Sequence, residues 1–169
     1  MRIESETAAD GPEVEALLDT CFGPGRVALS SYRLRDGVPP AGGLCLVARG
    51  RAGEVSGAIR FWPVRVGVWD AMLLGPVAVH PTRQGEGVGA LLIGTGLDRA
   101  AASGVERVLL VGDEPFYRRF GFRRLGGVAM PPPTNPDRVL GLWDWAGVAG
   151  EVERAAPLQG EGGGAMSSA

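Results

Sequence analysis

The segment of residues 79–92 constrains the fold more than any other part of the chain. It reads Val-His-Pro-Thr-Arg-Gln-Gly-Glu-Gly-Val-Gly-Ala-Leu-Leu and leads from an apolar strand through a polar turn into a glycine-rich helix start. A helix start with few side chains leaves backbone N–H groups unpaired and accessible, with the positive end of the helix dipole behind them. Such a helix start binds phosphate. The segment therefore predicts a strand–turn–helix unit that holds a phosphorylated ligand.

Two common nucleotide-binding folds do not fit this segment. A P-loop requires Gly-Lys-Ser/Thr, but all 17 basic residues of the chain are arginine. A Rossmann fold requires Gly-x-Gly-x-x-Gly after its first strand and repeated βαβ crossovers. Here the glycines follow several predicted strands and their spacing differs.

The rest of the chain predicts strands before this segment and one helical crossover after it. Apolar patterns and turn residues indicate strands at residues 2–6, 44–49, 54–66, 70–79, 106–111 and 139–145, and helices at residues 10–22, 27–35, 87–103 and 113–121. Asp10 is expected to cap the first helix. Short connections between the early strands predict an antiparallel meander. The fold class is therefore α+β: a mixed, mostly antiparallel central sheet with helices on both faces and one βαβ crossover.

The pair Gly75-Pro76 interrupts the apolar strand at residues 70–79. Proline cannot donate a hydrogen bond to a neighbouring strand, so a regular central strand does not accommodate it. The pair predicts a β-bulge, although a plain irregularity of the sheet remains an alternative.

Two motifs in this order resemble those of the GNAT superfamily of acyl-CoA N-acyltransferases. The run Gln84-x-x-Gly87-x-Gly89 resembles its pyrophosphate loop, and residues 116–122, Phe-Tyr-Arg-Arg-Phe-Gly-Phe, resemble its downstream signature. The run at residues 112–122 and the segments at 22–35 and 60–65 are similar to the YhbS-like bacterial subgroup. The likeness covers residues 2–145 and implies a GNAT-like sheet whose crossover carries the pyrophosphate loop.

The resemblance implies acetyl-CoA as the cofactor. The bulged strand would separate from the next strand to admit the pantetheine arm, and the loop would wrap the pyrophosphate through its N–H groups. The expected cofactor-binding residues are Val77, Ala78, Val79, Gln84, Gly85, Glu86, Gly87, Val88, Gly89 and Ala90. Glu86 would repel a diphosphate unless it faces solvent, where the repulsion is screened.

Tyr117 stands where the family often places a tyrosine near the thioester sulfur. A neutral amine would attack the acyl carbonyl directly, and Tyr117 would assist departure of the thiolate. The alternative for Tyr117 is a core aromatic beside Phe116 and Phe120. The general base stays open among a water chain, Asp113 and an unplaced group; His80 is more simply a turn residue, and Asp113 is also a natural helix N-cap.

The same resemblance places the acceptor pocket near the first helices and the strand at residues 54–66. The candidate substrate-binding residues are Phe22, Tyr32, Arg33, Arg60 and Trp62. If Arg33 or Arg60 lines the pocket, the acceptor carries a carboxylate or a phosphate. The alternatives are a solvated arginine surface and, for Trp62, packing in the core.

Bulk properties exclude several partner classes. The formal net charge of −2 gives no reason to expect nucleic acid. Cys21 and Cys45 lack metal-site spacing and the chain has one histidine, so no metal is expected. The charged start is unlike a signal peptide, and the apolar runs are shorter than the roughly 20 residues of a membrane span. We expect a cytoplasmic protein with no membrane association.

One domain is expected at residues 1–147, followed by a Gly/Ala/Ser-rich tail at 148–169 that becomes disordered from about residue 158. The predicted function is an acetyl-CoA-dependent N-acetyltransferase that acts on a primary amine of a small molecule or a protein. The alternative is a non-catalytic acyl-CoA-binding sensor or regulatory module. The resemblance alone suggests a homodimer.

Overall fold

The computed structural model describes residues 1–28 and 30–155. The strands are β1 (Arg2–Ser5), β2 (Leu46–Arg49), β3 (Val55–Val66), β4 (Trp69–Val79), β5 (Arg107–Val111), β6 (Arg123–Arg124), β7 (Val128–Ala129), β8 (Val139–Trp143) and β9 (Gly150–Arg154). The α-helices are α1 (Gly11–Phe22), α2 (Val88–Ala102) and α3 (Glu114–Tyr117). Short 3-10 helices are η1 (Ala8–Asp10), η2 (Pro24–Ala28), η3 (Ser30–Leu34), η4 (Pro81–Arg83), η5 (Arg118–Phe120) and η6 (Pro136–Arg138).

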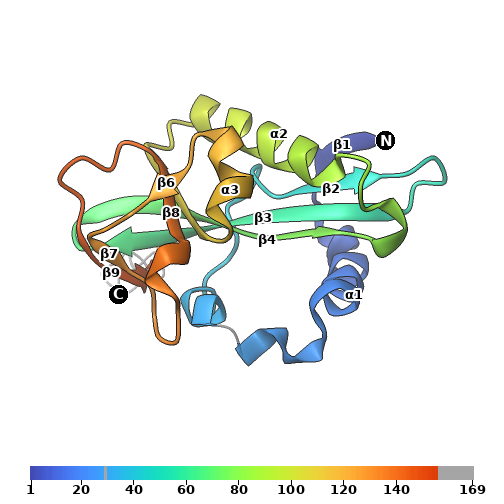
Figure 1. Cartoon of the computed structure of the whole chain (residues 1–169). Helices are drawn as coiled ribbons and strands as arrows, with labels where there is room; N and C mark the ends of the chain where they lie inside the picture. Colours follow the sequence, from blue (N-terminus) through green and yellow to red (C-terminus); the bar gives the residue numbers. More distant parts are fainter. Residues whose placement is uncertain (29, 156–169) are drawn as a thin grey trace, which may run out of the picture.

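A mixed nine-stranded sheet forms the centre of the molecule (Figure 1). Its main order is β1-β2-β3-β4-β5-β8-β6, and β9 pairs with both β3 and β7. Only β4–β5 and β7–β9 are parallel among the described pairs. Helix α2 connects β4 to β5 and is the predicted βαβ crossover. The predicted α+β fold class is therefore confirmed.

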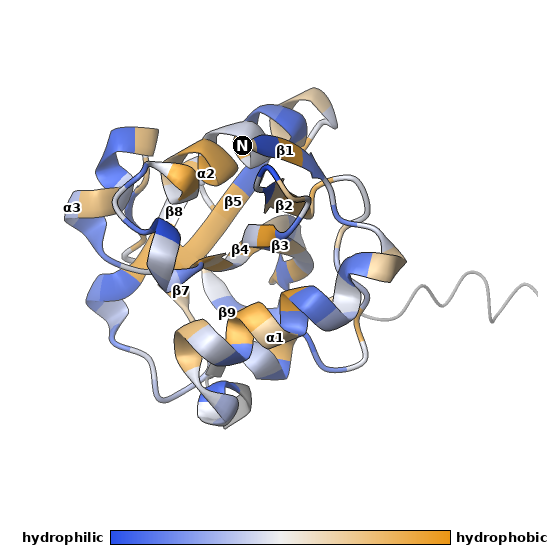
Figure 2. Ribbon diagram, turned by 90° about the vertical axis from the view of Figure 1, so that its right-hand side faces the viewer, coloured by the Kyte–Doolittle hydropathy of each residue, from blue (hydrophilic) through white to orange (hydrophobic). Residues whose placement is uncertain are grey.

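Helices cover both faces of the sheet. Helices α2 and α3 lie on one face, and α1 with η2 and η3 lies on the other (Figure 1). Leu92 and Ile93 of α2 pack in one buried cluster with Phe61 of β3. Gly96 permits this close packing, because a Cβ there would lie 2.7 Å from the Phe61 ring. Strand β5 is apolar after its first residue, Arg107 (orange in Figure 2), as expected for a strand that is covered on both faces.

The predicted bulge in β4 is present. Gly75 and Pro76 together lie opposite the single residue Arg60, because Phe61 pairs with Leu74 and Ile59 pairs with Val77. The side-chain alternation of β4 shifts by one residue here, so Leu74 before the bulge and Val77 after it both pack under α2. The described pairing of β4 with β5 covers only Met72 and Leu73. The second half of β4 is therefore paired with β3 along one edge and diverges from β5 along the other.

Two local predictions on the α1 side are wrong. The described residues within the range 27–35 are not α-helical; they lie in the 3-10 helices η2 and η3 and the turn that follows. Asp10 does not cap α1 with its side chain. Its carboxylate accepts a hydrogen bond from the Thr7 N–H at 2.8 Å and pairs with Arg49 at 2.6 Å, which closes a capping box on η1 instead.

The packed domain extends beyond residue 147. Strand β9, which the sequence patterns did not indicate, pairs with β3 through Val64↔Arg154 and Val66↔Val152. Val148 and Val152 are buried in the core. The expected tail therefore contains a sheet strand, whereas the expected disorder from about residue 158 lies outside the described residues. Within the described part of the chain, no helix is both long and apolar enough for a membrane span.

Candidate functional site

The glycine-rich loop between β4 and α2 has the backbone conformation that its sequence predicts. Gly85 and Gly87 have φ angles of +87° and +79°. This left-handed region suits glycine, because a Cβ would collide with the backbone. Gly87 directly precedes α2, whose first-turn N–H groups have no carbonyl partner within the helix. Gly89 lies inside α2, where a Cβ would make only ordinary contact with Val79 at 3.6 Å.

The acidic residue of this loop, Glu86, is exposed and paired with an arginine. Glu86 is exposed, as expected, and its carboxylate lies 3.4 Å from Arg83 Nη1. Gln84 is also exposed, and its Nε2 donates to the Val79 carbonyl at 3.4 Å. Beside the loop is a hollow of about 260 Å³ that is lined by Met1, Gly50, Arg51, Arg83, Glu86, Gly87, Val88 and Leu91. Arg83 was not among the predicted site residues, although it directly precedes the glycine motif.

The free edge of β4 starts where the bulge ends. Val77, Ala78 and Val79 pair with Ile59, Ala58 and Gly57 of β3 along one edge. The Val79 carbonyl also accepts a hydrogen bond from Cys21 Sγ at 3.3 Å. Burial raises the pKa of the Cys21 thiol, so this side chain stays protonated and serves as a packing group of α1.

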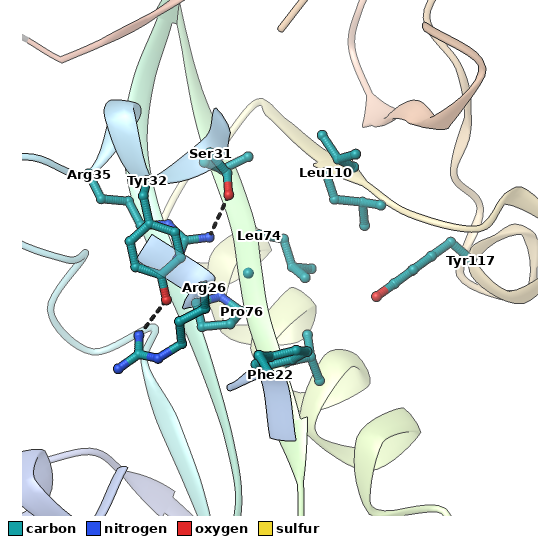
Figure 3. Close-up of a pocket in the computed structure, with 13 residues that line it drawn as sticks. Phe22, Arg26, Ser31, Tyr32, Arg35, Leu74, Pro76, Leu110 and Tyr117 are labelled. Atoms are coloured by element: carbon teal, nitrogen blue, oxygen red, sulfur yellow. Dashed lines mark hydrogen bonds between the residues drawn. The ribbon is translucent and has the colours of Figure 1, made fainter. Parts of the chain in front are cut away.

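A cavity of about 220 Å³ lies beside the bulge, between β4, the end of β5, α3 and the η2–η3 region. It is lined by Phe22, Arg26, Ser31, Tyr32, Arg35, Leu73, Leu74, Gly75, Pro76, Val77, Leu110, Val111 and Tyr117. We call it the central cavity. Figure 3 shows Tyr117 on one side of this cavity and Arg26, Tyr32 and Arg35 on the opposite side.

Tyr117 is held by aromatic packing and presents its hydroxyl to the central cavity (Figure 3). Its ring contacts Phe116 and Phe122 edge to face, with centroid distances of 4.9 and 5.9 Å. Gly112 leaves room for the ring, since a Cβ there would lie 2.5 Å from Tyr117 Cε2. Burial raises the pKa of the Tyr117 phenol above its ordinary value near 10, so the group stays protonated and can donate a hydrogen bond. No local sequence pattern indicates this role of Gly112.

The other candidate acid–base groups lie outside the central cavity. Asp113 is exposed at the N-cap position of α3, and its side chain makes no capping hydrogen bond. His80 precedes η4 and accepts a hydrogen bond from the Thr82 N–H at 3.2 Å. Neither residue lines the cavity. Among the residues that the structure describes, no cluster of three or more His, Cys, Asp or Glu side chains could hold a metal ion.

The predicted acceptor residues divide between two neighbouring spaces. Phe22 and Tyr32 line the central cavity. Arg33, Arg60 and Trp62 line an adjoining hollow of about 520 Å³, which we call the outer hollow, and Tyr32 lines both spaces. Trp62 is buried and donates from Nε1 to the Gly75 carbonyl at 2.9 Å, so it packs behind the bulge.

Arg60 is an internal ion-pairing residue. Its guanidinium contacts Glu6 at 2.7 and 3.1 Å and Glu15 at 2.7 Å, which ties the end of β1 to α1. Burial alone would favour the neutral form, but the hydrogen bonds that the guanidinium donates to Glu6 and Glu15 raise the pKa of Arg60. The expectation that Arg60 is free for substrate is therefore not met, because both carboxylates already occupy it.

Two arginines that the sequence analysis did not select line the central cavity. Arg26 pairs with Asp19 at 3.0 Å and with Glu15, and it donates to the Tyr32 hydroxyl. Arg35 stacks on the Tyr32 ring, with 4.4 Å between its Cζ and the ring centroid. No sequence signal distinguishes these two arginines from Arg33, because all three lie in irregular backbone whose side-chain directions depend on tertiary packing.

Comparisons with known proteins place this geometry in one family. Residues 41–124, which contain the glycine loop and most of the Tyr117 region, match the acetyltransferase (GNAT) domain. The N-acetyltransferase YhbS of Escherichia coli K12 is 36% identical over 125 residues, which cover 72% of this chain and 73% of YhbS.

Solved structures agree in fold. The structure of Escherichia coli YhbS in complex with CoA superposes with a TM-score of 0.77 and 31% identity, covering 91% of this chain and 89% of that one. A GNAT family acetyltransferase from Brucella melitensis in complex with acetyl-CoA has a TM-score of 0.68 and 29% identity, covering 92% of this chain and 96% of that one. The bulged β4, the glycine loop and the matched relatives together show that this chain belongs to the GNAT family of N-acetyltransferases.

Proposed function

We propose that the protein transfers an acetyl group from acetyl-CoA to a primary amine of a small molecule or a protein. The observation that carries this proposal is the alignment of three features along β4. The glycine loop follows its end, a free strand edge precedes the loop, and the central cavity with the Tyr117 hydroxyl lies at the bulge. A long ligand with a diphosphate at one end and a reactive group at the other matches this order.

The chain offers suitable groups for each part of acetyl-CoA. The N–H groups of residues 84–90 would bind the pyrophosphate, and the positive φ of Gly85 and Gly87 allows the backbone to approach it closely. Arg51 lines the hollow beside this loop and adds positive charge, whereas Arg83 in the same lining pairs with Glu54 and Glu86. The free edge of Val77, Ala78 and Val79 would pair with the pantetheine amides, which leaves the thioester at the central cavity.

Tyr117 would act on the leaving group. The neutral amine attacks the thioester carbonyl, the carbon–sulfur bond breaks, and CoA departs as a thiolate. Tyr117 donates a hydrogen bond, or its proton, to this sulfur. Because a free tyrosine titrates near 10 and a thiol near 8.5, full proton transfer is uphill by about 2 kcal/mol, and burial of Tyr117 increases this difference.

The amine would lose its proton to water. The described residues that line the central cavity include no carboxylate and no histidine. An amine therefore has to enter in its neutral form, and the proton released from the acetylated nitrogen passes to solvent through the open side of the cavity. The acetyltransfer rate should consequently rise with pH until the pKa of the amine itself is reached.

Thermal unfolding with and without ligands tests the cofactor part of this proposal. Acetyl-CoA or CoA at about 100 times its dissociation constant should stabilise the fold by about 2.7 kcal/mol, and NAD should have no effect. Thiol release in the presence of an amine panel then tests transfer. Stabilisation by both CoA species without thiol release from any amine would favour a non-catalytic acyl-CoA-binding module instead. No stabilisation by either CoA species would contradict the proposal.

A further inference from the structure

The charged residues of the central cavity all have the same sign. Among the 13 residues that line it, Arg26 and Arg35 are the only charged ones, and Ser31, Tyr32 and Tyr117 add hydroxyl groups. The other lining residues are apolar or glycine. Such a cavity disfavours an acceptor that carries a second positive charge and favours an acceptor with a negative group.

Of these two arginines, Arg26 is already neutralised. It pairs with Asp19 and Glu15, and although burial opposes it, these contacts and the hydrogen bond to Tyr32 raise the pKa of Arg26. The nearby Arg60 is neutralised in the same way by Glu6 and Glu15. Glu6, Glu15 and Asp19 are therefore committed to other arginines, and Asp36, the other carboxylate that lines the outer hollow, is exposed.

Arg35 is held differently. Its Cζ lies 4.4 Å from the Tyr32 ring centroid and 5.5 Å from the Trp62 ring centroid, and its Nη2 lies 3.4 Å from Ser31 Oγ. None of the ion pairs among the described residues involves Arg35, and its buried Nε has no hydrogen-bond partner. Burial lowers the pKa of Arg35 to about 10, as expected for a cation without a counter-ion.

Arg35 is also badly placed to serve the cofactor phosphates. Its Nη2 lies 3.8 Å from the position that a Cβ on Gly75 would occupy. Val79 lies four positions after Gly75, which is about 13 Å of extended strand, and the glycine loop begins only after Val79. Arg35 therefore faces the end of the site where the acetyl group and the acceptor meet, opposite Tyr117 (Figure 3).

We propose that the acceptor is an amino acid-like molecule, and that its carboxylate binds the Arg35 guanidinium while its amine faces the thioester. This inference rests on the proposed acetyltransferase activity and adds its substrate class. A guanidinium presents paired donors that match a carboxylate, and a bound anion offsets the cost of burying the Arg35 charge. The small volume of the cavity, about 220 Å³, also suits a compact acceptor. Arg35 is thus a specificity-determining residue.

Matched acceptor pairs test the proposal. Thiol release at saturating acetyl-CoA is measured with amino acids that carry an α-, β- or γ-amino group, each paired with its own carboxamide. The wild-type protein should prefer the carboxylate member of at least one pair by tenfold or more in kcat/KM. Arg35→Gln should raise KM for that carboxylate at least tenfold, leave the carboxamide nearly unchanged and leave acetyl-CoA affinity intact. Arg35→Lys should restore part of the preference.

Arg65→Gln is the matched control. Arg65 is exposed on β3, so this substitution removes the same charge at a position away from the cavity. It should behave as wild type. Equal use of carboxylates and carboxamides by the wild-type protein would overturn the inference, and so would a preference that survives Arg35→Gln. If Arg35→Gln does not fold, the inference is tested by the wild-type preference for carboxylates over carboxamides and by the change of that preference in Arg35→Lys.

Calorimetric titration of the same amino acids into the CoA-bound protein separates this inference from the proposed function. Arg35-dependent binding of a carboxylate without turnover would support the anion site and contradict the transfer reaction. Turnover of carboxamides without carboxylate binding would support the transferase and overturn the anion site. No binding of any carboxylate would also overturn the anion site, whatever the activity.

Discussion

The two ends of the proposed site differ in the groups that form them: backbone groups at one end and side chains at the other. At the proposed cofactor end, the groups expected to bind belong to the backbone: the left-handed Gly85 and Gly87, the start of α2 and the free edge of β4. At the proposed acceptor end, side chains from separate segments line one cavity, with Tyr117 from α3 on one side and Arg35 from the η3 region on the other. A site made of backbone groups can be predicted from the local spacing of glycine and proline. A site made of side chains from distant segments forms only when those segments pack together.

The largest expected effect on activity comes from a substitution at the acceptor end. Tyr117→Phe keeps the ring packing but removes the hydroxyl, so kcat should fall about 100-fold, which corresponds to about 2.7 kcal/mol of transition-state stabilisation. Acetyl-CoA affinity should stay nearly unchanged. Steady-state kinetics and calorimetry measure the two quantities. Unchanged kcat would remove Tyr117 from the mechanism.

A change at the cofactor end should produce the opposite pattern. Gly87→Val places a β-branched residue at a φ of +79°, which costs about 1–3 kcal/mol and distorts the loop. The dissociation constant of acetyl-CoA should rise about tenfold. Gly94→Val is the control, because Gly94 lies in the middle of α2 with open space around it. Equal affinities for the two variants would show that the loop does not bind the cofactor.

The two kinds of arginine should respond differently in stability. Arg35→Met removes a poorly compensated buried charge, so the free energy of unfolding should increase by about 1 kcal/mol. Arg60→Met leaves Glu6 and Glu15 without their partner and should decrease the free energy of unfolding. Chemical denaturation of both variants measures the difference. A loss of stability in Arg35→Met would mean that its ring contacts outweigh its desolvation.

A smaller effect is expected from Gly112→Ala. The new methyl group would meet the Tyr117 ring at 2.5 Å and shift its hydroxyl, so kcat should fall several-fold while acetyl-CoA still binds. Gly126→Ala, with nothing within 4 Å of the added methyl group, should leave kcat unchanged. Equal kcat values for the two variants would indicate that the position of the ring is not critical.

The smallest effect concerns the pH dependence of activity, because we expect no alkaline loss of activity below pH 10. Tyr117 acts in its protonated form, and burial raises its pKa above 10 in the folded protein. The activity should therefore persist as the pH rises from 7 to 10 and be lost only above that range. A pH–rate profile with an amine of low pKa measures this. Loss of activity near pH 8–9 that is absent in Tyr117→Phe would contradict the raised pKa.

The same contrast explains what could be read from the sequence. The bulge at Gly75-Pro76, the positions of the loop glycines, the antiparallel meander and the βαβ crossover follow from local patterns, and the structure confirms them. Tyr117 could be named because a motif carries it. Strand β9 was missed, because five residues with one buried side chain give no periodic signal.

Arg35 and Arg60 show why the acceptor end could not be read in the same way. Arg60 occupies a regular strand and was a reasonable candidate, yet two glutamates from other segments occupy its guanidinium. Arg35 was not selected, and only the packing of η3 against the bulge brings it to the cavity. Which arginine is neutralised depends on long-range contacts that no local pattern records.

The bulge in β4 consists of one extra residue, and the cavity depends on that residue whereas the rest of the fold does not. Gly75 and Pro76 share the space opposite Arg60, so a chain that lacked Pro76 could pair Gly75 with Arg60 and still keep Leu74 opposite Phe61 and Val77 opposite Ile59. Every core side chain of β4 would keep its face. The sheet would close, while the irregularity that lines the cavity would be lost. We therefore expect deletion of Pro76 alone to preserve the fold and to remove the opening beside β4.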